Sequence, residues 1–195
     1  MSENTLCLAG RVAVVLGGTT GLGRAISLGL ADAGADVIAS GRRRDKIDSV
    51  AAEIESKHRR TSRISCDVCD REALLSPLHK VLEDFPRVDI LVNAAGKIKR
   101  APTLDFPKED WHDMLNTNLH GTMRACQVFG RHMLERNFGR IINITSLNSF
   151  VSLSQVTAYA VSKAGVSALT RSLAVEWAKH GPGERDCSRR VSHRV

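Results

Sequence analysis

Aromatic residues are scarce in this chain, which has two Trp, one Tyr and five Phe among its 195 residues. Basic clusters lie at 42–44, 58–60 and 97–100, and the formal net charge is +7, but the clusters contain no aromatic residue. Proteins that bind single-stranded nucleic acids combine basic grooves with aromatic side chains on which bases stack. We therefore expect no nucleic-acid partner, and we interpret the positive charge as suited to an anionic cofactor and substrate.

Long apolar runs are lacking as well. No stretch of the sequence approaches the ~20 apolar residues that a membrane-spanning helix needs. Residues 1–10 have neither the basic start nor the apolar stretch of a signal peptide. The composition, 43% hydrophobic and 25% charged, is that of a soluble globular domain. We expect a cytoplasmic protein without a membrane partner.

The sequence also lacks a disulfide or metal framework. Its five cysteines are odd in number and irregularly spaced, which favours reduced thiols. Cys66 and Cys69 form a C-x-x-C pair, but no second pair follows at metal-ligand spacing. The seven histidines form no H-x-x-x-H motif. These patterns predict no metal site.

Short β-branched runs alternate with segments of helical periodicity along most of the chain. We predict strands at 11–16, 36–40, 62–66, 88–92 and 140–145, and helices at 25–34, 46–57, 70–85, 107–138 and 155–179. Pro77 should strain the helix in which it lies. Such alternation is typical of a parallel sheet covered by helices. The expected fold class is therefore α/β, a doubly wound parallel sheet (Rossmann fold) with three α/β/α layers.

A glycine-rich turn, GGTTGLG, joins the first predicted strand to the first helix. Its glycines let the backbone turn sharply and approach a pyrophosphate, which then sits at the positive end of the helix. The spacing G-x-x-x-G-x-G differs from the G-x-G-x-x-G dinucleotide fingerprint, but the strand-to-helix context is the same. The candidate cofactor-binding residues of this turn are Gly17, Thr19, Gly21, Leu22 and Gly23.

Arginines follow the second predicted strand, where a carboxylate would meet the ribose 2′-hydroxyl of NAD. The sequence there is Gly41, Arg42, Arg43 and Arg44. A guanidinium can hold a 2′-phosphate in a bidentate way. Arg42 therefore favours NADP as the cofactor and leaves NAD as the alternative. A solvated helix start is the other interpretation of this run.

Two more strand ends carry candidate cofactor-binding residues. Asp67 and Val68 follow the third predicted strand, and Asp67 could meet an adenine. The fourth predicted strand leads into Asn93, Ala94 and, two residues later, Gly96. Small residues at the carboxyl end of a strand suit a place where a cofactor lies against the backbone.

The proton-transfer candidates lie further along the chain. Tyr159 and Lys163 are four residues apart in a predicted helix, so they share a helix face. An ammonium favours the phenolate form of a nearby tyrosine, which makes Tyr159 a candidate general acid and base. A surface Tyr and Lys on an ordinary helix is the alternative. Asn118 interrupts a predicted helix, where a buried amide could hold a bend or a water chain. Ser146 stands at the end of the fifth predicted strand.

Taken in order, these motifs resemble the short-chain dehydrogenase/reductase family over nearly the whole chain, to about His180. The resemblance implies an NAD(P)-dependent oxidoreductase that transfers a hydride between nicotinamide and a carbonyl or alcohol carbon. It also implies roles for four residues. Tyr159 would donate and accept the proton, Ser146 would hydrogen-bond the substrate oxygen, Lys163 would bind the nicotinamide ribose beside Tyr159, and Asn118 would anchor a proton-relay water.

Within the family, the amino-acid sequences of residues 93–123 and 172–181 resemble those of the sugar-acid branch. The resemblance implies a small-molecule substrate, a sugar acid such as gluconate or ketogluconate. Its carboxylate would fit the basic segment 97–100, unless that segment is only a solvated loop. The family commonly forms tetramers, which leaves a homo-oligomer through the helices 109–136 and 155–179 open.

The sequence after Gly181 departs from the family pattern, which calls for another strand, a Pro-Gly loop and a segment over the substrate. Residues 182–195 are polar and Arg-rich instead. Codons can be chosen for residues 183–195 whose reading from the second base encodes VNAIAPGVFRTA, the peptide that the family pattern expects. We therefore hypothesise a family domain at 1–181 that is truncated at its C-terminus, followed by a frameshifted tail at 182–195. A catalytically defective cofactor-binding or oligomerising fragment is the alternative function.

Overall fold

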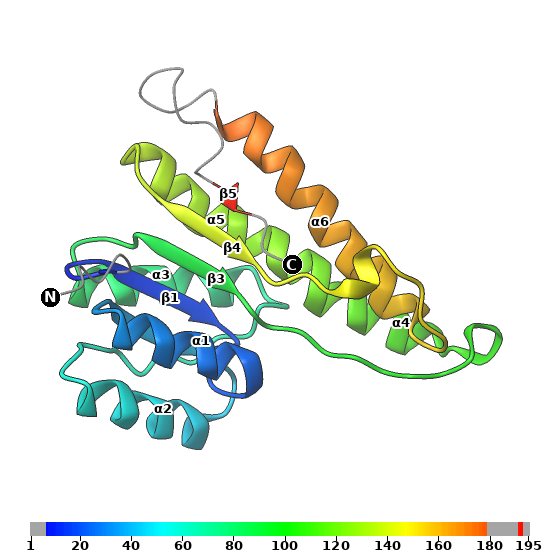
Figure 1. Cartoon of the computed structure of the whole chain (residues 1–195), viewed down its shortest axis with the longest axis horizontal. Coiled ribbons are helices and arrows are strands. Elements are labelled where there is room, and N and C mark those ends of the chain that lie inside the picture. The colour runs from blue at the N-terminus through cyan, green and yellow to red at the C-terminus, as the bar shows by residue number, and fades with distance from the viewer. Residues whose placement is uncertain (1–6, 179–190, 193–195) are drawn as a thin grey trace, which may run out of the picture.

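The computed structural model describes residues 7–178 and 191–192 and contains a five-stranded parallel sheet of order β2-β1-β3-β4-β5 (Figure 1). The strands are β1 (Val12–Leu16), β2 (Asp36–Ser40), β3 (Ile90–Asn93), β4 (Arg140–Asn143) and β5 (Val191–Ser192). The chain passes from β1 outward to β2 and then returns to place β3 on the other side of β1. This reversal is the switch point at which a doubly wound sheet binds its ligand, and it confirms the predicted fold class.

Helices cover both faces of the sheet. They are α1 (Gly21–Asp32), α2 (Arg44–Ser56), α3 (Glu72–Asp84), α4 (Lys108–Leu115), α5 (Gly121–Glu135) and α6 (Thr157–Ala178), with short turns η1 (Thr103–Asp105), η2 (Asn116–His120) and η3 (Leu147–Ser149). Side chains of α1 and α2 pack on one face of the sheet, and those of α3, α5 and α6 pack on the other.

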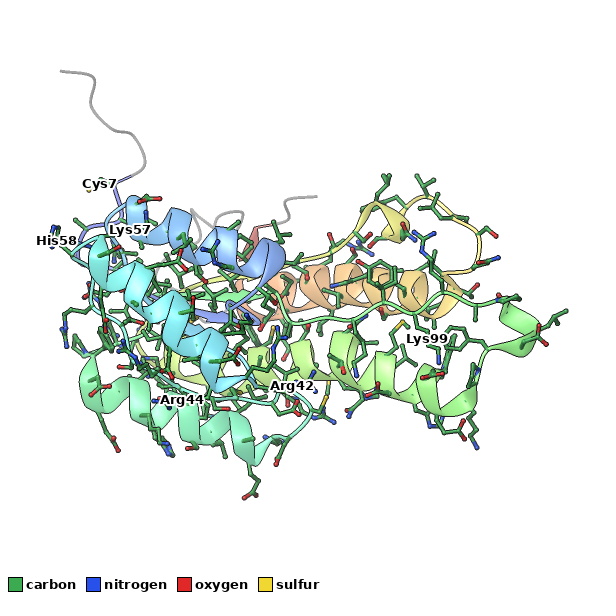
Figure 2. The ribbon with its side chains drawn as sticks, turned by 90° about the horizontal axis from the view of Figure 1, so that it is seen from below. Cys7, Arg42, Arg44, Lys57, His58 and Lys99 are labelled. Atoms are coloured by element: carbon green, nitrogen blue, oxygen red, sulfur yellow. The ribbon has the colours of Figure 1, made fainter. Side chains whose placement is uncertain are left out.

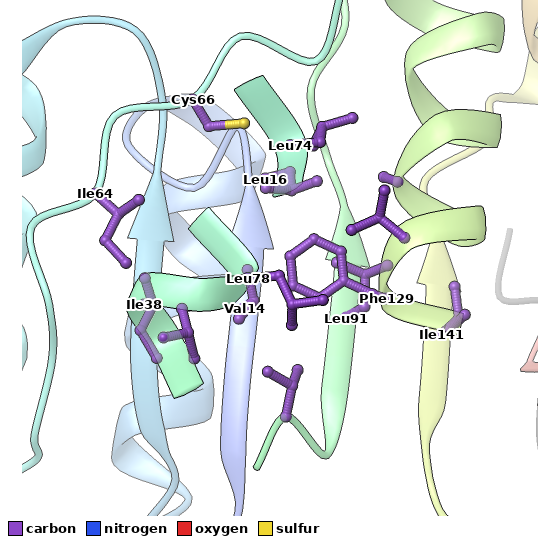
Figure 3. Close-up of a cluster of buried hydrophobic side chains, with 14 of the residues drawn as sticks. Val14, Leu16, Ile38, Ile64, Cys66, Leu74, Leu78, Leu91, Phe129 and Ile141 are labelled. Carbon is purple, nitrogen blue, oxygen red and sulfur yellow. The ribbon is translucent and has the colours of Figure 1, made fainter. Parts of the chain in front are cut away.

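The two apolar cores follow from the alternation of side chains along each strand. Val14 and Leu16 of β1 face the α3 and α5 side, where Figure 3 shows the ring of Phe129 among Leu78 and Leu91. The intervening β1 residues face the α1 and α2 side. Burial of strands on both faces explains why they read as nearly continuous apolar runs.

The helix predicted at 107–138 is continuous but contains a π-helical turn, η2, between α4 and α5. Asn118 lies in this turn and is fully buried. π-Helical turns are rare and often mark functional sites. The structure thus places Asn118 in an irregular turn of this helix, and the expectation that its amide holds a bend or a water chain stays a prediction.

Pro77 lies inside α3, as predicted. Proline cannot donate the usual hydrogen bond to the carbonyl four residues earlier, here that of Ala73. The Cys66 thiol donates to this carbonyl oxygen instead, over 3.4 Å. The Cys66 thiol therefore supplies a donor to the carbonyl that Pro77 leaves without its usual hydrogen bond.

The strand predicted at 62–66 is wrong, since the segment forms only one bridge, between Ser65 and Gly41. The segment does run along β2, because Val37 N donates to the Arg60 carbonyl and Cys66 N donates to the Gly41 carbonyl. In a parallel pair, a residue donates to the residue before its partner and accepts from the residue after it, so both bonds correspond to one register, with 37 opposite 61 and 41 opposite 65. Between these two positions a side chain makes the contact, because the Ser40 hydroxyl donates to the Ile64 carbonyl at 2.9 Å.

The prediction of a tail without a strand is also wrong in part. Val191–Ser192 forms β5, which pairs with Ile141 and Ile142 of β4. The rest of the tail and the predicted domain boundary at residue 181 lie outside the described residues. Ile142 and Ile144 are only partly buried on the α1 and α2 side of the sheet.

None of the described helices has the length and apolar character needed to cross a bilayer.

Candidate active site

A cleft of about 800 Å³ opens at the carboxyl ends of the central strands. It is lined by the ends of β1, β2 and β3, by the segment after Ser65 and by η2, which bring together residues far apart in the sequence: Leu16, Gly17, Thr19, Thr20, Gly21, Leu22, Gly23, Ser40, Gly41, Arg42, Arg43, Cys66, Asp67, Val68, Ala94, Ala95, Gly96, Lys97 and Thr117. Ten of the eleven residues that the sequence predicted only for cofactor binding are among them. The exception is Asn93.

The glycine-rich turn forms a cradle without side chains at the switch point. Gly17 has a φ of 78°, and a Cβ there would lie 2.5 Å from the Ala95 nitrogen. A Cβ on Gly23 would overlap the Gly17 carbonyl oxygen. The start of α1 thus packs directly against the turn, and its amide groups and positive dipole end face the cleft. The residues present fit a dinucleotide pyrophosphate.

Arg42 and Asp67 face each other at the β2 end of the cleft. Arg42 Nη1 lies 3.9 Å from Asp67 Oδ2, and both side chains are exposed to solvent. Figure 2 shows Arg42 near the start of α2. An exposed ion pair of this length contributes little stability. The guanidinium is therefore available to an anionic ligand.

Asn93 lies beneath the cleft and not in its lining. Its side chain is 4% exposed and donates to Asn143 Oδ1 at 2.8 Å. Its backbone carbonyl accepts from Ile144 N at 3.0 Å. Asn93 therefore holds β3 to β4, while Ala94 and Gly96 form the surface above it.

Lys163 is buried at the end of β4. The Lys163 ammonium donates to the Ile144 carbonyl oxygen at 2.7 Å and is 6% exposed. Burial lowers the pKa of Lys163 to about 8, because desolvation disfavours the charged form. The Nζ atom lies 5.9 Å from the centroid of the Tyr159 ring one turn earlier on α6. Tyr159 itself is half-buried.

The Asn118 amide joins three parts of the site. Its Oδ1 accepts from Lys97 N at 2.9 Å, and its Nδ2 donates to the Lys97 carbonyl at 2.9 Å and to Ser162 Oγ at 3.0 Å. A Cβ placed on Gly96 would lie 3.4 Å from Asn118 Oδ1 and 3.6 Å from Lys163 Nζ. Asn118 and Lys163 are therefore neighbours across Gly96.

Ser146 follows β4 and caps the short turn η3, which packs against α6. Its Oγ accepts from Asn148 N at 3.2 Å. The hydroxyl hydrogen is not used by this bond, so it can be donated to another oxygen. Ser146 thus lies on the same face of the molecule as Lys163, two residues after the carbonyl that Lys163 binds.

The expectation that the segment 97–100 binds a substrate carboxylate stays a prediction, and the structure shows what its lysines contact. Lys97 forms an ion pair with Asp113, and Lys99, labelled in Figure 2, forms one with Asp110. Both acids belong to α4, which the sequence did not place beside this segment. Arg100 is exposed and forms no ion pair among the described residues.

Sequence reasoning missed several residues of this region. Thr20, Arg43 and Thr117 line the cleft, and Ser162 connects Asn118 to α6. The Ser162 hydroxyl donates to the Tyr159 carbonyl at 2.7 Å while it accepts from Asn118. Ser162 could have been predicted from the sequence, because it is a small polar residue directly before Lys163 on the buried side of the helix.

Comparison with known proteins gives the same picture. A sequence model of the short chain dehydrogenase family matches residues 11–181. Gluconate 5-dehydrogenase of Gluconobacter oxydans (strain 621H) is 34% identical over 174 residues, which cover 89% of this chain and 68% of that enzyme. 2-Dehydro-3-deoxy-D-gluconate 5-dehydrogenase of Bacillus subtilis (strain 168) is 40% identical over 179 residues, covering 92% of this chain and 70% of that enzyme.

A solved structure matches as well. The gluconate 5-dehydrogenase from Burkholderia cenocepacia J2315, crystallised in complex with NADP and tartrate, superposes with a TM-score of 0.86 at 32% identity. The match covers 90% of this chain and 69% of that one. With its switch-point cleft, its glycine cradle and these relatives, the chain belongs to the short-chain dehydrogenase family of oxidoreductases.

Proposed function

We propose that this chain is an NADP-dependent oxidoreductase that acts on a sugar acid such as gluconate or ketogluconate. The observation that carries the proposal is the meeting of the glycine-lined cleft with Lys163, Asn118 and Tyr159 at one sheet edge. The names of the relatives, which act on gluconate or a dehydro-deoxy-gluconate, support the substrate class. The carboxylate of the substrate would meet Arg100, because the two lysines nearby are paired with α4.

The cofactor supplies or accepts the hydride at its nicotinamide ring when it is bound. The chain supplies the proton. Tyr159 gives a proton to the substrate oxygen in reduction and takes it back in oxidation. Ser146 orients that oxygen with its free hydroxyl hydrogen. Lys163, with a pKa lowered to about 8, can replace the proton on Tyr159 near neutral pH.

Asn118 and Lys163 form the inner end of the proton path. The Asn118 amide is fixed by the Lys97 backbone and by Ser162. It is thus held rigid beside Lys163, as a group that places a proton-relay water must be. Its own side chain does not need to exchange a proton.

Arg42 is the residue that would select NADP. Its pairing with Asp67 is long and exposed. A 2′-phosphate carries more negative charge than a carboxylate and accepts two parallel hydrogen bonds from a guanidinium. The NADP bound by the Burkholderia enzyme supports this choice. NAD remains the alternative cofactor.

Reduction of 5-ketogluconate, followed by loss of NADPH absorbance, tests the proposal. The chain should consume NADPH only when the keto acid is present, and Tyr159→Phe should lower the rate by at least about 100-fold, within the range expected for loss of a general acid. Equal rates for both proteins would contradict the role of Tyr159.

A cofactor-binding chain without turnover is the second candidate. Four apolar side chains in the segment that follows Ser146 are exposed, namely Leu147, Phe150, Val151 and Leu153. A productive substrate pocket normally buries such side chains and excludes water. NADPH binding without oxidation by the keto acid would favour this candidate.

Sequencing the encoding DNA would test the proposed frameshift at 182–195, since codons incompatible with the second reading would exclude it.

Self-association is a separate part of the proposal. The helices 109–136 and 155–179 expose Met123, Val161 and Val175, and apolar side chains on exposed helix faces mark interaction surfaces when they are contiguous. Light scattering should give a mass above that of one 21.3 kDa chain. A monomer at all concentrations would contradict it.

A further inference from the structure

Hydrogen bonds between buried side chains connect β3, β4 and α6. Asn93 and Asn143 are register partners on neighbouring strands, and Asn93 Nδ2 donates to Asn143 Oδ1 at 2.8 Å. Asn143 Nδ2 donates to Thr170 Oγ1 at 2.9 Å. The Thr170 hydroxyl then donates to the Val166 carbonyl oxygen at 2.7 Å. The two asparagines and Thr170 are 4%, 2% and 2% exposed.

Burial of so many polar groups needs an explanation. Burying an amide costs free energy unless each donor and acceptor finds a partner. Here both side-chain Nδ2 groups and Asn143 Oδ1 have partners, and the Cys126 thiol also reaches Asn143 Oδ1 at 3.7 Å. Apolar side chains could fill the same space, but hydrogen bonds fix direction and distance as well. The network therefore determines how α6 lies on the sheet.

Lys163 is attached to the next residue of the same strand. Ile144 follows Asn143, and its carbonyl accepts from Lys163 Nζ at 2.7 Å. Its amide donates to the Asn93 carbonyl at 3.0 Å. Lys163 and Thr170 are seven residues apart, which is two turns of helix, so they share the face of α6 that meets β4. Figure 1 shows α6 running along the side of the sheet at which β4 lies.

We infer that Asn143 and Thr170 are positioning residues, which fix α6 on β4 so that the Lys163 ammonium meets the Ile144 carbonyl. This inference rests on the proposed function only for the use made of Lys163. Without the Asn143–Thr170 bond, α6 can rotate or shift by a fraction of an ångström, and water can reach the ammonium. The catalytic placement of Lys163 then depends on a residue two turns away that touches neither cofactor nor substrate.

The pH at which Lys163 loses its proton depends on where its ammonium lies, so measuring it tests the placement of Lys163 without an activity assay. Tyr159 is the titratable group that faces Lys163 from its own helix. Asn118 on η2 and the Ile144 carbonyl on β4 are neutral. Trace acetylation of the folded chain across pH 6–11, with mass spectrometry of the peptide that contains Lys163, gives the midpoint at which the amine becomes reactive. Thr170→Val removes the hydroxyl, and Thr170→Ser keeps it.

Ser167→Ala is the matched control. Ser167 lies on the same helix and is 3% exposed, but its hydroxyl has no hydrogen-bond partner among the described residues. We expect Thr170→Val to raise the labelling midpoint by about one pH unit or more, a tenfold change in proton equilibrium. Thr170→Ser and Ser167→Ala should leave the midpoint unchanged.

Several results would overturn the inference. One is an unchanged midpoint in Thr170→Val, and another is an equal shift in Ser167→Ala, which would indicate general loosening of α6. Should Thr170→Val fail to fold, Thr170→Ala takes its place and must show the same shift. Unfolding of both would show a role in folding and not in placement. Absence of turnover together with the expected shift would contradict the proposed function and support this inference.

Discussion

Gly23 packs so closely against the Gly17 carbonyl oxygen that a side chain on Gly23 has no room. Gly23→Ala should therefore destabilise the chain by about 1–3 kcal/mol, as overpacking does in a rigid core. It should also weaken NADPH binding, because the start of α1 is displaced from the cleft. Chemical denaturation and a fluorescence titration measure the two effects.

Gly29→Ala is the matched control for this prediction. Gly29 lies on the same helix, and a Cβ there meets nothing within 4 Å. Alanine in a helix interior is favoured over glycine by about 1 kcal/mol. Gly29→Ala should therefore stabilise the chain and leave NADPH affinity unchanged, and equal destabilisation by both variants would contradict the role of close packing at Gly23.

Stability should depend on pH through Lys163. The pKa of Lys163 is about 8 in the folded chain and 10.5 ordinarily, so the unfolded chain holds this proton more tightly. As pH rises through this window, the folded chain loses the proton first and is stabilised. The free energy of unfolding of the chain, minus that of Lys163→Met, should be flat below about pH 8 and rise toward pH 10.5. A difference that falls or stays flat would show that Lys163 is not desolvated.

Thiol reactivity tests the burial of two cysteines. Burial raises the pKa of Cys66 to about 12, with help from Asp67 and Asp70, and burial raises that of Cys126 to about 12. At pH 8 roughly one such thiol in ten thousand is ionised, and the thiolate is the reactive form. Iodoacetamide should modify the exposed Cys7 long before Cys66 or Cys126. Labelling of all three at similar rates, read by peptide mass spectrometry, would contradict the packing of the apolar core on the α3 and α5 side of the sheet.

Arg42 should control cofactor choice. Loss of a hydrogen-bonded ion pair with a phosphate costs about 1.5–3 kcal/mol, so Arg42→Ser should weaken NADPH binding by about 10–100-fold and leave NADH binding nearly unchanged. Arg44→Ser is the control, because Arg44 is engaged with Asp48. An equal loss in both variants would point to a general effect of positive charge.

The sequence predicted the layers of the fold well because local patterns determine them. β-Branched runs and glycine turns marked the strand ends, and strand ends in a parallel sheet meet at one edge. The predictions failed where distant segments decide the outcome. Residues 62–66 read as a strand, but the segment forms only one bridge beside β2, and its Ile64 carbonyl accepts from the Ser40 hydroxyl.

The partners of ion pairs could not be predicted from the sequence either. Lys97 and Lys99 read as a free basic segment until the fold placed Asp113 and Asp110 beside them. Thr170 read as an ordinary helix residue, because the meaning of its hydroxyl depends on Asn143, 27 residues earlier. Long-range pairs of this kind are fixed by how α4 and α6 pack.

Titration of the chain with NADPH and with NADH is the most direct measurement of the central claim, that the cleft beside Arg42 and the glycine cradle is an NADP site. Intrinsic fluorescence of the two tryptophans, or energy transfer to the nicotinamide, gives both affinities. The account predicts saturable binding of NADPH, at least about tenfold tighter than NADH, which corresponds to 1.4 kcal/mol. Equal affinity for both, or no saturable binding of either, would contradict it.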